Sequence, residues 1–299
     1  DFEVEKPFVV PLDKAREPDI FYNINGKSNY KSKSKLNKIV TFQKNPVSFK
    51  DYNKSFQIVK KELNYGNTYL LNLTFPTKIE TNLTLREIFL YSKAKYKLLF
   101  KDEFVVFSPE IFVKIKGGRI FSHPMKGTID ASVPGAQEKI MIDSKEMAEH
   151  VTIVDLIRND LSMVAKKVKV DKFRYIDEIT THEKKLLQVS SEISGEMPLN
   201  YNEIIGDIIF TLLPAGSICG APKKKTVDII KEVENYHRNY YTGICGIFDG
   251  YDLDSGVMIR FIENTPEGLI FKSGGGITVN SDVEKEYQEL IDKVYVPII

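Results

Sequence analysis

The sequence predicts an α+β fold with largely antiparallel sheets. Segments of strand composition and segments of helical spacing are mixed along the chain, without the regular β-α-β alternation that builds a parallel sheet. Leu98–Pro109 and Ile111–Phe121 have the pattern of meander strands, and the second segment turns at Gly117-Gly118. There is no internal repeat and no long linker in the 299 residues. We therefore expect neither a repeat protein nor a doubly wound fold.

Composition restricts the classes of function. The chain has 42 Lys and Arg against 41 Asp and Glu, so no overall field favours nucleic acid or an anionic membrane as a partner. Its two cysteines, Cys219 and Cys245, are far apart, which argues against a disulfide scaffold or a structural zinc site. The longest apolar stretch, Ile204–Leu213, is too short to span a bilayer. We expect a soluble, cytoplasmic protein.

The first half of the chain contains a clear helix followed by a strand. The helix is expected over Ser48–Tyr65, ending at Gly66. Its apolar positions have helical spacing and are Tyr52, Phe56, Val59 and Leu63. Thr68–Phe75 is rich in β-forming residues and too short for a second helix, so it predicts a strand.

The strongest helical signal covers Ser144–Ala165. The apolar stripe expected to face the core consists of Met147, Val151, Val154 and Leu161. Glu146 and Glu149 are three residues apart and so lie together on one side of this helix. Exposed glutamates on a helix usually serve only solvation, so the pair alone does not establish a site.

The second half alternates between strands and helices. We expect a strand at Gln188–Glu196, helices at Tyr201–Leu213 and Pro222–Val233, and paired strands at Tyr240–Gly250 and Gly256–Glu263. Proline suits the first turn of the second helix, where free N–H groups also suit an anion.

The last recognisable stretch is Lys272–Lys293. Its three glycines, Gly274, Gly275 and Gly276, would let backbone N–H groups converge on an anion, and Ser281 with Glu284 predicts a capping box. Glu286 and Glu289 lie on one helical face, with Lys293 one turn further. Together these residues suggest a divalent cation held with an anionic small molecule. Taken alone, the stretch also fits a glycine turn followed by an ordinary solvated helix.

Seven segments, in order, carry a resemblance to a known family. They are SPEIF (108–112), HPMKGT (123–128), KEMAEHVTIVDLIRNDL (145–161), PAGSICGAPK (214–223), YYTGICGIF (240–248), VMIRF (257–261) and SGGGITVNSDVEKEYQELIDK (273–293). With them the chain resembles the chorismate-utilising enzymes, which include anthranilate, aminodeoxychorismate, isochorismate and salicylate synthases. The resemblance implies one chorismate-binding catalytic domain over residues 1–299, with 1–50 a shortened N-terminal segment. It also implies two largely antiparallel sheets packed together, with helices outside.

The resemblance assigns a Mg²⁺ site to the glutamates. Glu149 and Glu289 match the two residues that hold the metal, which binds the ring carboxylate of chorismate. Glu146 and Glu286, one turn away, would act as further or water-mediated partners. Mg²⁺ prefers few carboxylates, with waters and an anionic ligand, so two direct glutamates are sensible. The amides of the three glycines and Lys293 would face the same carboxylate.

Other matched residues would bind the substrate or react with it. Tyr241 and Arg260 match the pair that binds the enolpyruvyl carboxylate, for which arginine offers a bidentate fork, and Thr128 is expected to contact the substrate. Lys126 stands where aminodeoxychorismate synthases carry lysine and anthranilate synthases carry a small residue. The implied mechanism has neutral Lys126 attack C2 of chorismate while Glu110 acts as general acid toward the C4 hydroxyl.

The resemblance is therefore closest to aminodeoxychorismate synthase component I. Ammonia, supplied by a separate glutamine amidotransferase subunit, would attack C4 and give 4-amino-4-deoxychorismate for 4-aminobenzoate and folate synthesis. Leu70 stands where isochorismate and salicylate synthases need a lysine base, which argues against those activities. Ammonia-using relatives commonly have Gln at Leu70, and many members have His at Gln188. Two alternatives stay open: anthranilate synthase component I, and a chorismate-binding subunit without catalysis.

Overall fold

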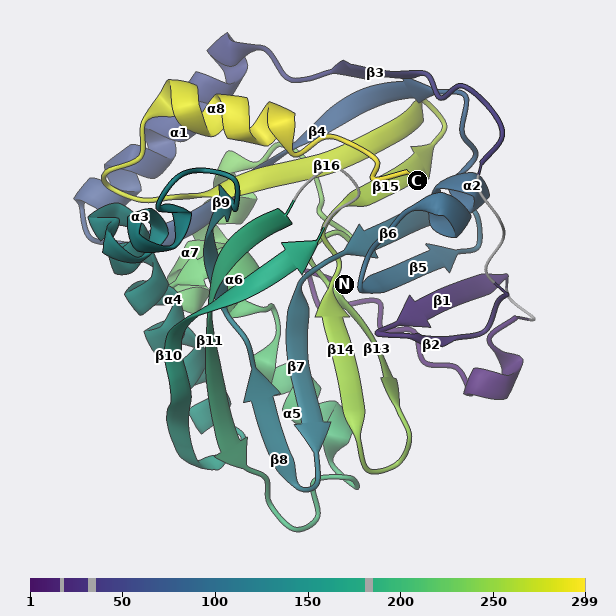
Figure 1. Ribbon diagram of the computed structural model, residues 1–299, viewed down its shortest axis with the longest axis vertical. Coiled ribbons are helices and arrows are strands. Elements are labelled where there is room, and N and C mark those ends of the chain that lie inside the picture. The colour runs from purple at the N-terminus through teal and green to yellow at the C-terminus, as the bar shows by residue number, and fades with distance from the viewer. Residues whose placement is uncertain (17–18, 32–35, 181–184, 299) are drawn as a thin grey trace. The chain divides into compact units, whose positions relative to one another are not determined.

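A computed structural model describes residues 1–16, 19–31, 36–180 and 185–298. The chain folds into two compact units, and it crosses from one to the other four times (Figure 1). Unit 1 consists of Asp1–Glu110, Ile218–Gly246 and Ser255–Ile299, and unit 2 consists of Ile111–Ser217 and Ile247–Asp254. The expectation that residues 1–299 act as one catalytic domain stays a prediction.

One sheet has nine strands in the order β12-β4-β16-β15-β6-β5-β1-β2, with β3 added beside β4. Its strands are β1 (Ile20–Ile24), β2 (Lys27–Ser28), β3 (Phe42–Asn45), β4 (Leu70–Thr81), β5 (Tyr96–Phe100), β6 (Phe104–Ser108), β12 (Gly220–Ala221), β15 (Phe261–Thr265) and β16 (Gly268–Ile277). Neighbouring strands in this sheet run antiparallel, including the long central pair β4 and β16.

The other sheet has seven strands in the order β10-β11-β8-β7-β14-β13, with β9 beside β11. They are β7 (Ile111–Lys116), β8 (Arg119–Ser122), β9 (Met125–Asp130), β10 (Lys166–Thr180), β11 (Lys185–Glu196), β13 (Ile244–Phe248) and β14 (Leu253–Val257). The pairs around β11 are antiparallel. Two antiparallel sheets with helices confirm the α+β prediction.

Helices complete both units. They are α1 (Phe49–Asn64), α2 (Leu85–Tyr91), α3 (Ala136–Ile142), α4 (Ser144–Ser162), α5 (Ile205–Leu212), α6 (Gly216–Cys219), α7 (Lys223–Val233) and α8 (Val283–Asp292), with a short 3-10 helix at Leu12–Lys14. In unit 1, α8 contacts β16 and α1, and in unit 2, α4 contacts β9, β10 and β11 (Figure 1). Among the described residues, no helix is long and apolar enough to cross a membrane.

Helix α1 forms as its sequence predicts. The Ser48 side chain accepts a hydrogen bond from the Asp51 N–H, which caps one of the free donors of the first turn. The four residues with helical spacing are all buried, and Gly66 has a φ of 78° just beyond the helix. The predicted strand after it is β4, which extends to Thr81.

The prediction of one strand over Leu98–Pro109 was wrong. The segment is a hairpin of β5 and β6, in which Lys101 and Asp102 turn with φ values of 49° and 55°. The Glu103 N–H donates to the Phe100 carbonyl at 2.8 Å and closes the turn. Positive φ at both central positions is usually signalled by Asn or Gly, and this chain gives no such signal.

The same kind of error occurs after β14. The expected strand Gly256–Glu263 is divided between β14 and β15, because the chain leaves the extended conformation at Arg260, whose φ is 52°. Arg260 is neither Gly nor Asn, and the sequence did not reveal this break. The long strand β10 was not predicted.

The core-facing side of α4 differs from the predicted stripe. Val154 and Leu161 are buried, but Met147 is 37% exposed and Val151 is 47% exposed. The side that faces the sheet also contains Ile153, Ile157 and the fully buried His150. Because His150 is polar, the apolar pattern did not include it, and Met147 and Val151 were expected on the core-facing side instead.

The three glycines of the last stretch form part of a strand and not a turn. Gly274, Gly275 and Gly276 lie in β16, opposite Thr74, Leu73 and Asn72 of β4. A Cβ on Gly274 would lie 2.4 Å from the Leu73 carbonyl oxygen, so close packing on β4 requires glycine there. The alternative expectation of a glycine turn was therefore wrong, while the expectation that these amides face an anion stays a prediction.

The cap of the following helix was also misassigned. The N-cap of α8 is Asp282, whose side chain accepts from the Lys285 N–H, while the Ser281 hydroxyl accepts from the Thr278 N–H. The predicted capping box of Ser281 and Glu284 does not form. The helix nevertheless begins within two residues of the expected position.

Candidate functional site

The predicted site residues fall into two groups, each held within its own unit. Unit 2 contains Lys126, Thr128, Glu146 and Glu149. Unit 1 contains Glu110, Tyr241, Arg260, Gly274, Gly275, Gly276, Glu286, Glu289 and Lys293.

Lys126 lies in a β-bulge of unit 2. Met125 pairs with Ser190 and Thr128 pairs with Gln188, so two residues of β9, Lys126 and Gly127, stand opposite one residue of β11. Gly127 has a φ of 79°, which only glycine adopts without strain. Bulges bend a strand and re-aim its side chains, and they are common beside active sites.

Two carboxylates of α4 face this bulge. The Lys126 ammonium lies 3.7 Å from Oε2 of Glu149, and both side chains are half-buried. A Cβ on Gly127 would lie 3.1 Å from Oε2 of Glu146, so the other carboxylate lies directly over the glycine. The Asp143 side chain caps α4 through the Glu146 N–H and so fixes the first turn, which carries Glu146.

A buried polar cluster centres on His150, one turn after Glu146 on α4, and sequence reasoning did not select it. Nε2 of His150 is 2.6 Å from the Ser191 hydroxyl, which also accepts from the Arg174 N–H at 2.9 Å. Burial, together with the smaller effects of the Arg174 and Lys126 charges, lowers the pKa of His150 to about 4, so this imidazole is neutral at pH 7. The spacing of His150 with Val154 and Leu161 is the signal that could have placed it inside.

Gln188 is the residue that departs from the family pattern in this unit. Its side-chain amide lies 3.5 Å from the Thr128 hydroxyl across the β9–β11 pair, at the outer limit of a hydrogen bond. Thr128 is exposed, so the pair presents a hydroxyl and an amide next to the bulge. Neither group titrates near neutral pH, in contrast to a histidine at position 188.

The corresponding carboxylates of unit 1 project from α8 over β16. A Cβ on Gly275 would lie 3.5 Å from Oε2 of Glu286 and 3.5 Å from Oε1 of Glu289. Burial raises the pKa of Tyr52, and the negative charges of Glu286 and Glu289 raise it further, which places this buried phenol close to both. The predicted sharing of one helical face by the two glutamates is confirmed.

Lys293 completes this group. It is the C-cap residue of α8, and its ammonium lies 2.6 Å from Oε1 of Glu289 and donates to the Gly274 carbonyl at 2.9 Å. The pairing one turn after Glu289 is the expected i,i+4 contact. The strand carbonyl fixes the ammonium against β16.

Tyr241 belongs to the core of unit 1. It is 3% exposed and packs in a cluster with Phe104, Val106 and Phe261. Burial raises the pKa of Tyr241, Arg238 and Arg260 oppose that rise, and Glu234 and Glu110 add to it. The phenol is therefore neutral and can act only as a neutral hydrogen-bonding group.

Arg260 and Glu110 lie near Tyr241 in the same unit, as their electrostatic effects on it indicate. The guanidinium of Arg260 is 5.5 Å from the Tyr295 ring, and its buried Nε has no hydrogen-bond partner among the described residues. A buried donor without a partner is costly and favours an incoming acceptor. Glu110 is half-buried, and its N–H donates to the Ser108 hydroxyl.

The donors present suit a hard divalent cation. Both pairs offer only carboxylate oxygens, and each pair has a glycine, with no side chain of its own, on the neighbouring strand. Within the described ranges, no three His, Cys, Asp or Glu side chains gather as a complete metal site. Mg²⁺ is typically bound by one or two carboxylates, with waters and an anionic ligand completing its shell, so the residues fit this ion.

Comparison with known proteins identifies the family. A family model described as chorismate binding enzyme matches residues 12–298. An uncharacterized PabA-like protein of Haemophilus influenzae is 52% identical over 298 residues, covering 100% of this chain and 90% of that protein. Aminodeoxychorismate synthase component 1 of Bacillus subtilis is 29% identical over 265 residues, covering 84% of this chain and 55% of that protein.

A solved structure supports the fold. Anthranilate synthase component I from Streptococcus pneumoniae TIGR4 aligns with a TM-score of 0.71 at 23% identity, covering 84% of this chain and 58% of that one. At this identity the likeness concerns the fold alone.

Proposed function

The chain belongs to the chorismate-binding enzyme family, and we propose that it is the synthase component that converts chorismate and ammonia to 4-amino-4-deoxychorismate. The observation that carries this proposal is Lys126 in the bulge of β9, half-buried and 3.7 Å from the Glu149 carboxylate. The bulge gives this lysine a defined direction, and its partner can accept or return a proton. Such an arrangement suits a lysine nucleophile better than a solvated surface lysine.

In the proposed reaction Lys126 acts first. Its neutral Nζ forms a bond to C2 of chorismate, the ring double bond shifts, and the C4–O bond breaks. Glu110 protonates the departing hydroxyl, which leaves as water. Ammonia then forms a bond to C4, the double bond shifts back, and the C2–Nζ bond breaks, so that Lys126 is regenerated. Glu149 accepts the proton that Nζ loses in the first step and returns it to the departing amine, and the proton lost by the new C4 ammonium restores Glu110 as an acid.

Binding would use the remaining residues. Arg260 and Tyr241 would hold the enolpyruvyl carboxylate, one by a charge-assisted fork and the other by its phenol. Lys293 and the strand Gly274–Gly276 would face the ring carboxylate. Thr128 would contact the substrate beside Lys126. Glu149 and Glu289 would hold Mg²⁺, with Glu146 and Glu286 as further or water-mediated partners, and the ion would neutralise the ring carboxylate.

The proposed reaction also needs a source of ammonia. The sequence contains no amidotransferase triad signature, so we propose a separate glutamine amidotransferase subunit as its source. The product would then supply 4-aminobenzoate synthesis through a lyase, in the cytoplasm.

A product assay tests the proposal. Chorismate, Mg²⁺ and an ammonium salt are supplied, products are identified by mass, and an aminodeoxychorismate lyase is added afterwards. We expect 4-aminobenzoate only after the lyase. Anthranilate without the lyase would instead establish the second candidate, anthranilate synthase component I, and chorismate binding without turnover would support a non-catalytic subunit.

Lys126→Ala tests the nucleophile itself. We expect no 4-amino product above background, because no other group replaces the amine. Lys114→Ala is a matched control, since Lys114 lies in the same unit with similar exposure and also has a carboxylate partner, Asp254, at 3.3 Å. Unchanged turnover in Lys126→Ala would remove this residue from the mechanism.

A further inference from the structure

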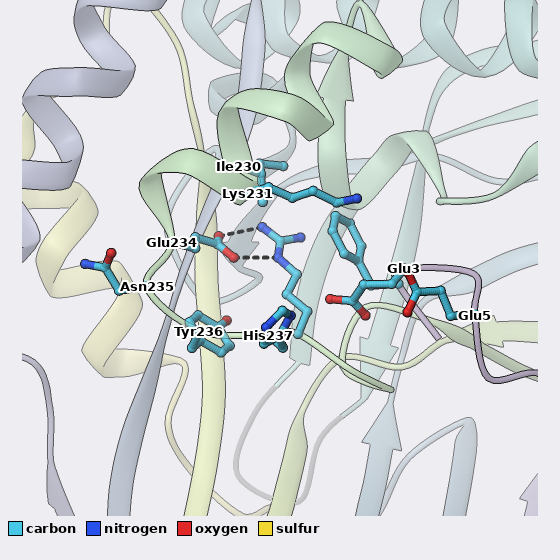
Figure 2. A pocket seen from close by; sticks show the side chains of 10 residues that line it. Glu3, Glu5, Ile230, Lys231, Glu234, Asn235, Tyr236 and His237 are labelled. Carbon is cyan, nitrogen blue, oxygen red and sulfur yellow. Dashed lines mark hydrogen bonds and ion pairs between the residues drawn. The ribbon is translucent and has the colours of Figure 1, made fainter.

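Unit 1 contains a fully buried ion pair that the proposed chemistry does not use. Nε of Arg238 donates to Oε2 of Glu234 at 2.8 Å, and Nη2 of Arg238 donates to Oε1 at 2.6 Å, with both side chains 1% exposed. Figure 2 shows the two parallel bonds. Burying two charges is expensive unless their geometry is excellent and the remaining donors are satisfied.

The remaining donors of Arg238 connect three other segments. Nη1 donates to the Ile218 carbonyl of α6 at 3.1 Å and to the Thr242 hydroxyl at 3.4 Å. Nη2 also donates to the Asn72 carbonyl of β4 at 2.6 Å. One guanidinium therefore joins the end of α7, strand β4, helix α6 and the turn that follows Arg238.

The carboxylate is equally well satisfied. Oε1 of Glu234 accepts from the N–H and from the hydroxyl of Thr74, each at 2.8 Å. The ion pair has no free donor left to bind a ligand, so its role is to fix the segments that it contacts. A buried network in which every member is satisfied is rigid and fixes one local structure.

The segment that it holds carries Tyr241. The Tyr241 N–H donates to the Arg238 carbonyl at 3.1 Å, and the Thr242 hydroxyl donates to the Tyr241 carbonyl at 2.6 Å. Asn239 and Thr242 have φ values of 52° and 62°. Non-glycine residues keep such conformations only where the surroundings enforce them.

The same turn is tied to the segment before Arg260. The Thr242 N–H donates to the Met258 carbonyl at 2.9 Å, and the Met258 N–H donates to the Gly243 carbonyl at 2.8 Å. Displacement of the turn would therefore disturb the backbone that leads to Arg260 as well as Tyr241.

We propose that Arg238 is a positioning residue, which acts through the Glu234 ion pair to hold the turn 239–242 and thereby sets Tyr241 for carboxylate binding. The proposal rests on the proposed function in one respect, the role of Tyr241 toward chorismate. The position of Tyr241 itself is independent of that role and can be measured separately.

A cavity beside the ion pair makes a sharp test possible. It has a volume of about 350 Å³ and borders Arg238, whose guanidinium carbon also lies 4.5 Å from the Phe2 ring (Figure 2). The other lining residues include Glu3, Lys231 and Tyr236. Truncation of Arg238 to alanine would enlarge this cavity by the space of one guanidinium group, so free guanidinium ion can enter and restore the lost bonds.

The experiment uses the full chain labelled with 3-fluorotyrosine. The ¹⁹F signal of Tyr241 is identified as the one absent from Tyr241→Phe. In Arg238→Ala we expect this signal to move or broaden, and to return when guanidinium chloride is added below the concentrations that unfold the protein. In the chorismate assay we expect KM to rise much more than kcat falls, with a loss in kcat/KM on the order of 100-fold.

A matched control separates positioning from general loosening. Lys97 is another buried cation of unit 1 that donates to two backbone carbonyls, of Phe89 and Ser92. We expect Lys97→Met to leave the Tyr241 signal in place. Should Arg238→Ala not fold, Arg238→Lys is measured in the same way, because it keeps the charge and loses the parallel bonds.

Three results would overturn the inference: an unchanged Tyr241 signal in the folded Arg238 variant, an equal change in Lys97→Met, or a change that guanidinium does not reverse. Because the ¹⁹F signal needs no turnover, a wild-type chain that makes no 4-amino product would contradict the proposed function and leave this test valid.

Discussion

Gly127→Ala is the most informative single substitution in the bulge. The backbone at this position has a φ of 79°, and a Cβ there would lie 3.1 Å from Oε2 of Glu146. The new methyl group therefore has two separate effects. It strains the backbone, and it pushes on a carboxylate of the proposed Mg²⁺ site.

The two effects have different sizes. Alanine at positive φ costs about 1 kcal/mol of folding free energy, which lowers the melting temperature of a unit of this size by roughly 4 °C. The Glu146 carboxylate must also give way by a few tenths of an ångström. If a displacement of 1 Å costs about 100-fold in rate, then about 0.3 Å costs about fourfold.

Gly118→Ala separates these effects. Gly118 turns between β7 and β8 of the same unit with a φ of 74°, and a Cβ there would meet no atom within 4 Å. We expect both variants to melt at similarly lowered temperatures in calorimetry. Only Gly127→Ala should lose turnover and need more Mg²⁺ for half-maximal activity.

Equal turnover in the two alanine variants would refute the reasoning, because the contact with Glu146 would then have no consequence. A melting temperature for Gly118→Ala equal to that of wild type would instead refute the claim that alanine at positive φ destabilises the fold. The two measurements are independent, so each part of the argument can fail alone.

Two further predictions concern protons and metal. The pKa of His150 is about 4 in the folded chain and about 6.5 when unfolded, so its contribution to the free energy of unfolding is complete above pH 6.5. That contribution declines as the pH falls toward 4, by about 2 kcal/mol between pH 7 and pH 5. His150→Gln should remove that part of the acid sensitivity in unfolding curves, and identical pH dependence in both proteins would exclude His150 as its source. Chelation by EDTA should abolish turnover reversibly in wild type, and Glu289→Gln should raise the Mg²⁺ requirement; turnover that persists in EDTA would argue against the metal.

The sequence predicted local structure well where side-chain chemistry alone determines it. The cap and buried positions of α1 follow from Ser48 and a regular apolar spacing, and the structure confirms them. The i,i+3 glutamates and Lys293 were found for the same reason, because helical spacing fixes which side chains meet.

Prediction failed where tertiary contacts override local signals. The turn at Lys101-Asp102 and the break at Arg260 have positive φ without Gly or Asn, so no turn residue announced them. The glycines of β16 also fitted a turn in the sequence, although it is close packing against β4 that requires glycine at position 274. The Glu234–Arg238 network joins segments more than 100 residues apart, which no local pattern can reveal.

The same arrangement of residues occurs once in each unit. It consists of two glutamates three residues apart on a helix, a glycine beneath them on a strand, and a lysine paired with the second glutamate. The members are Glu146, Glu149, Gly127 and Lys126 in unit 2, and Glu286, Glu289, Gly275 and Lys293 in unit 1. In each case the glycine places no side chain of its own beneath the carboxylates.

The two arrangements differ in where the lysine originates, and this difference matches their proposed roles. Lys293 projects from the same helix as its partner Glu289, at 2.6 Å, and is also bonded to a strand carbonyl, so its ammonium is fixed as a charge. Lys126 projects from the strand bulge toward Glu149 on a separate helix, at the longer distance of 3.7 Å. A nucleophile must leave its carboxylate partner to attack, whereas a binding charge must stay. The looser pairing of Lys126 therefore favours it, and not Lys293, as the reacting amine.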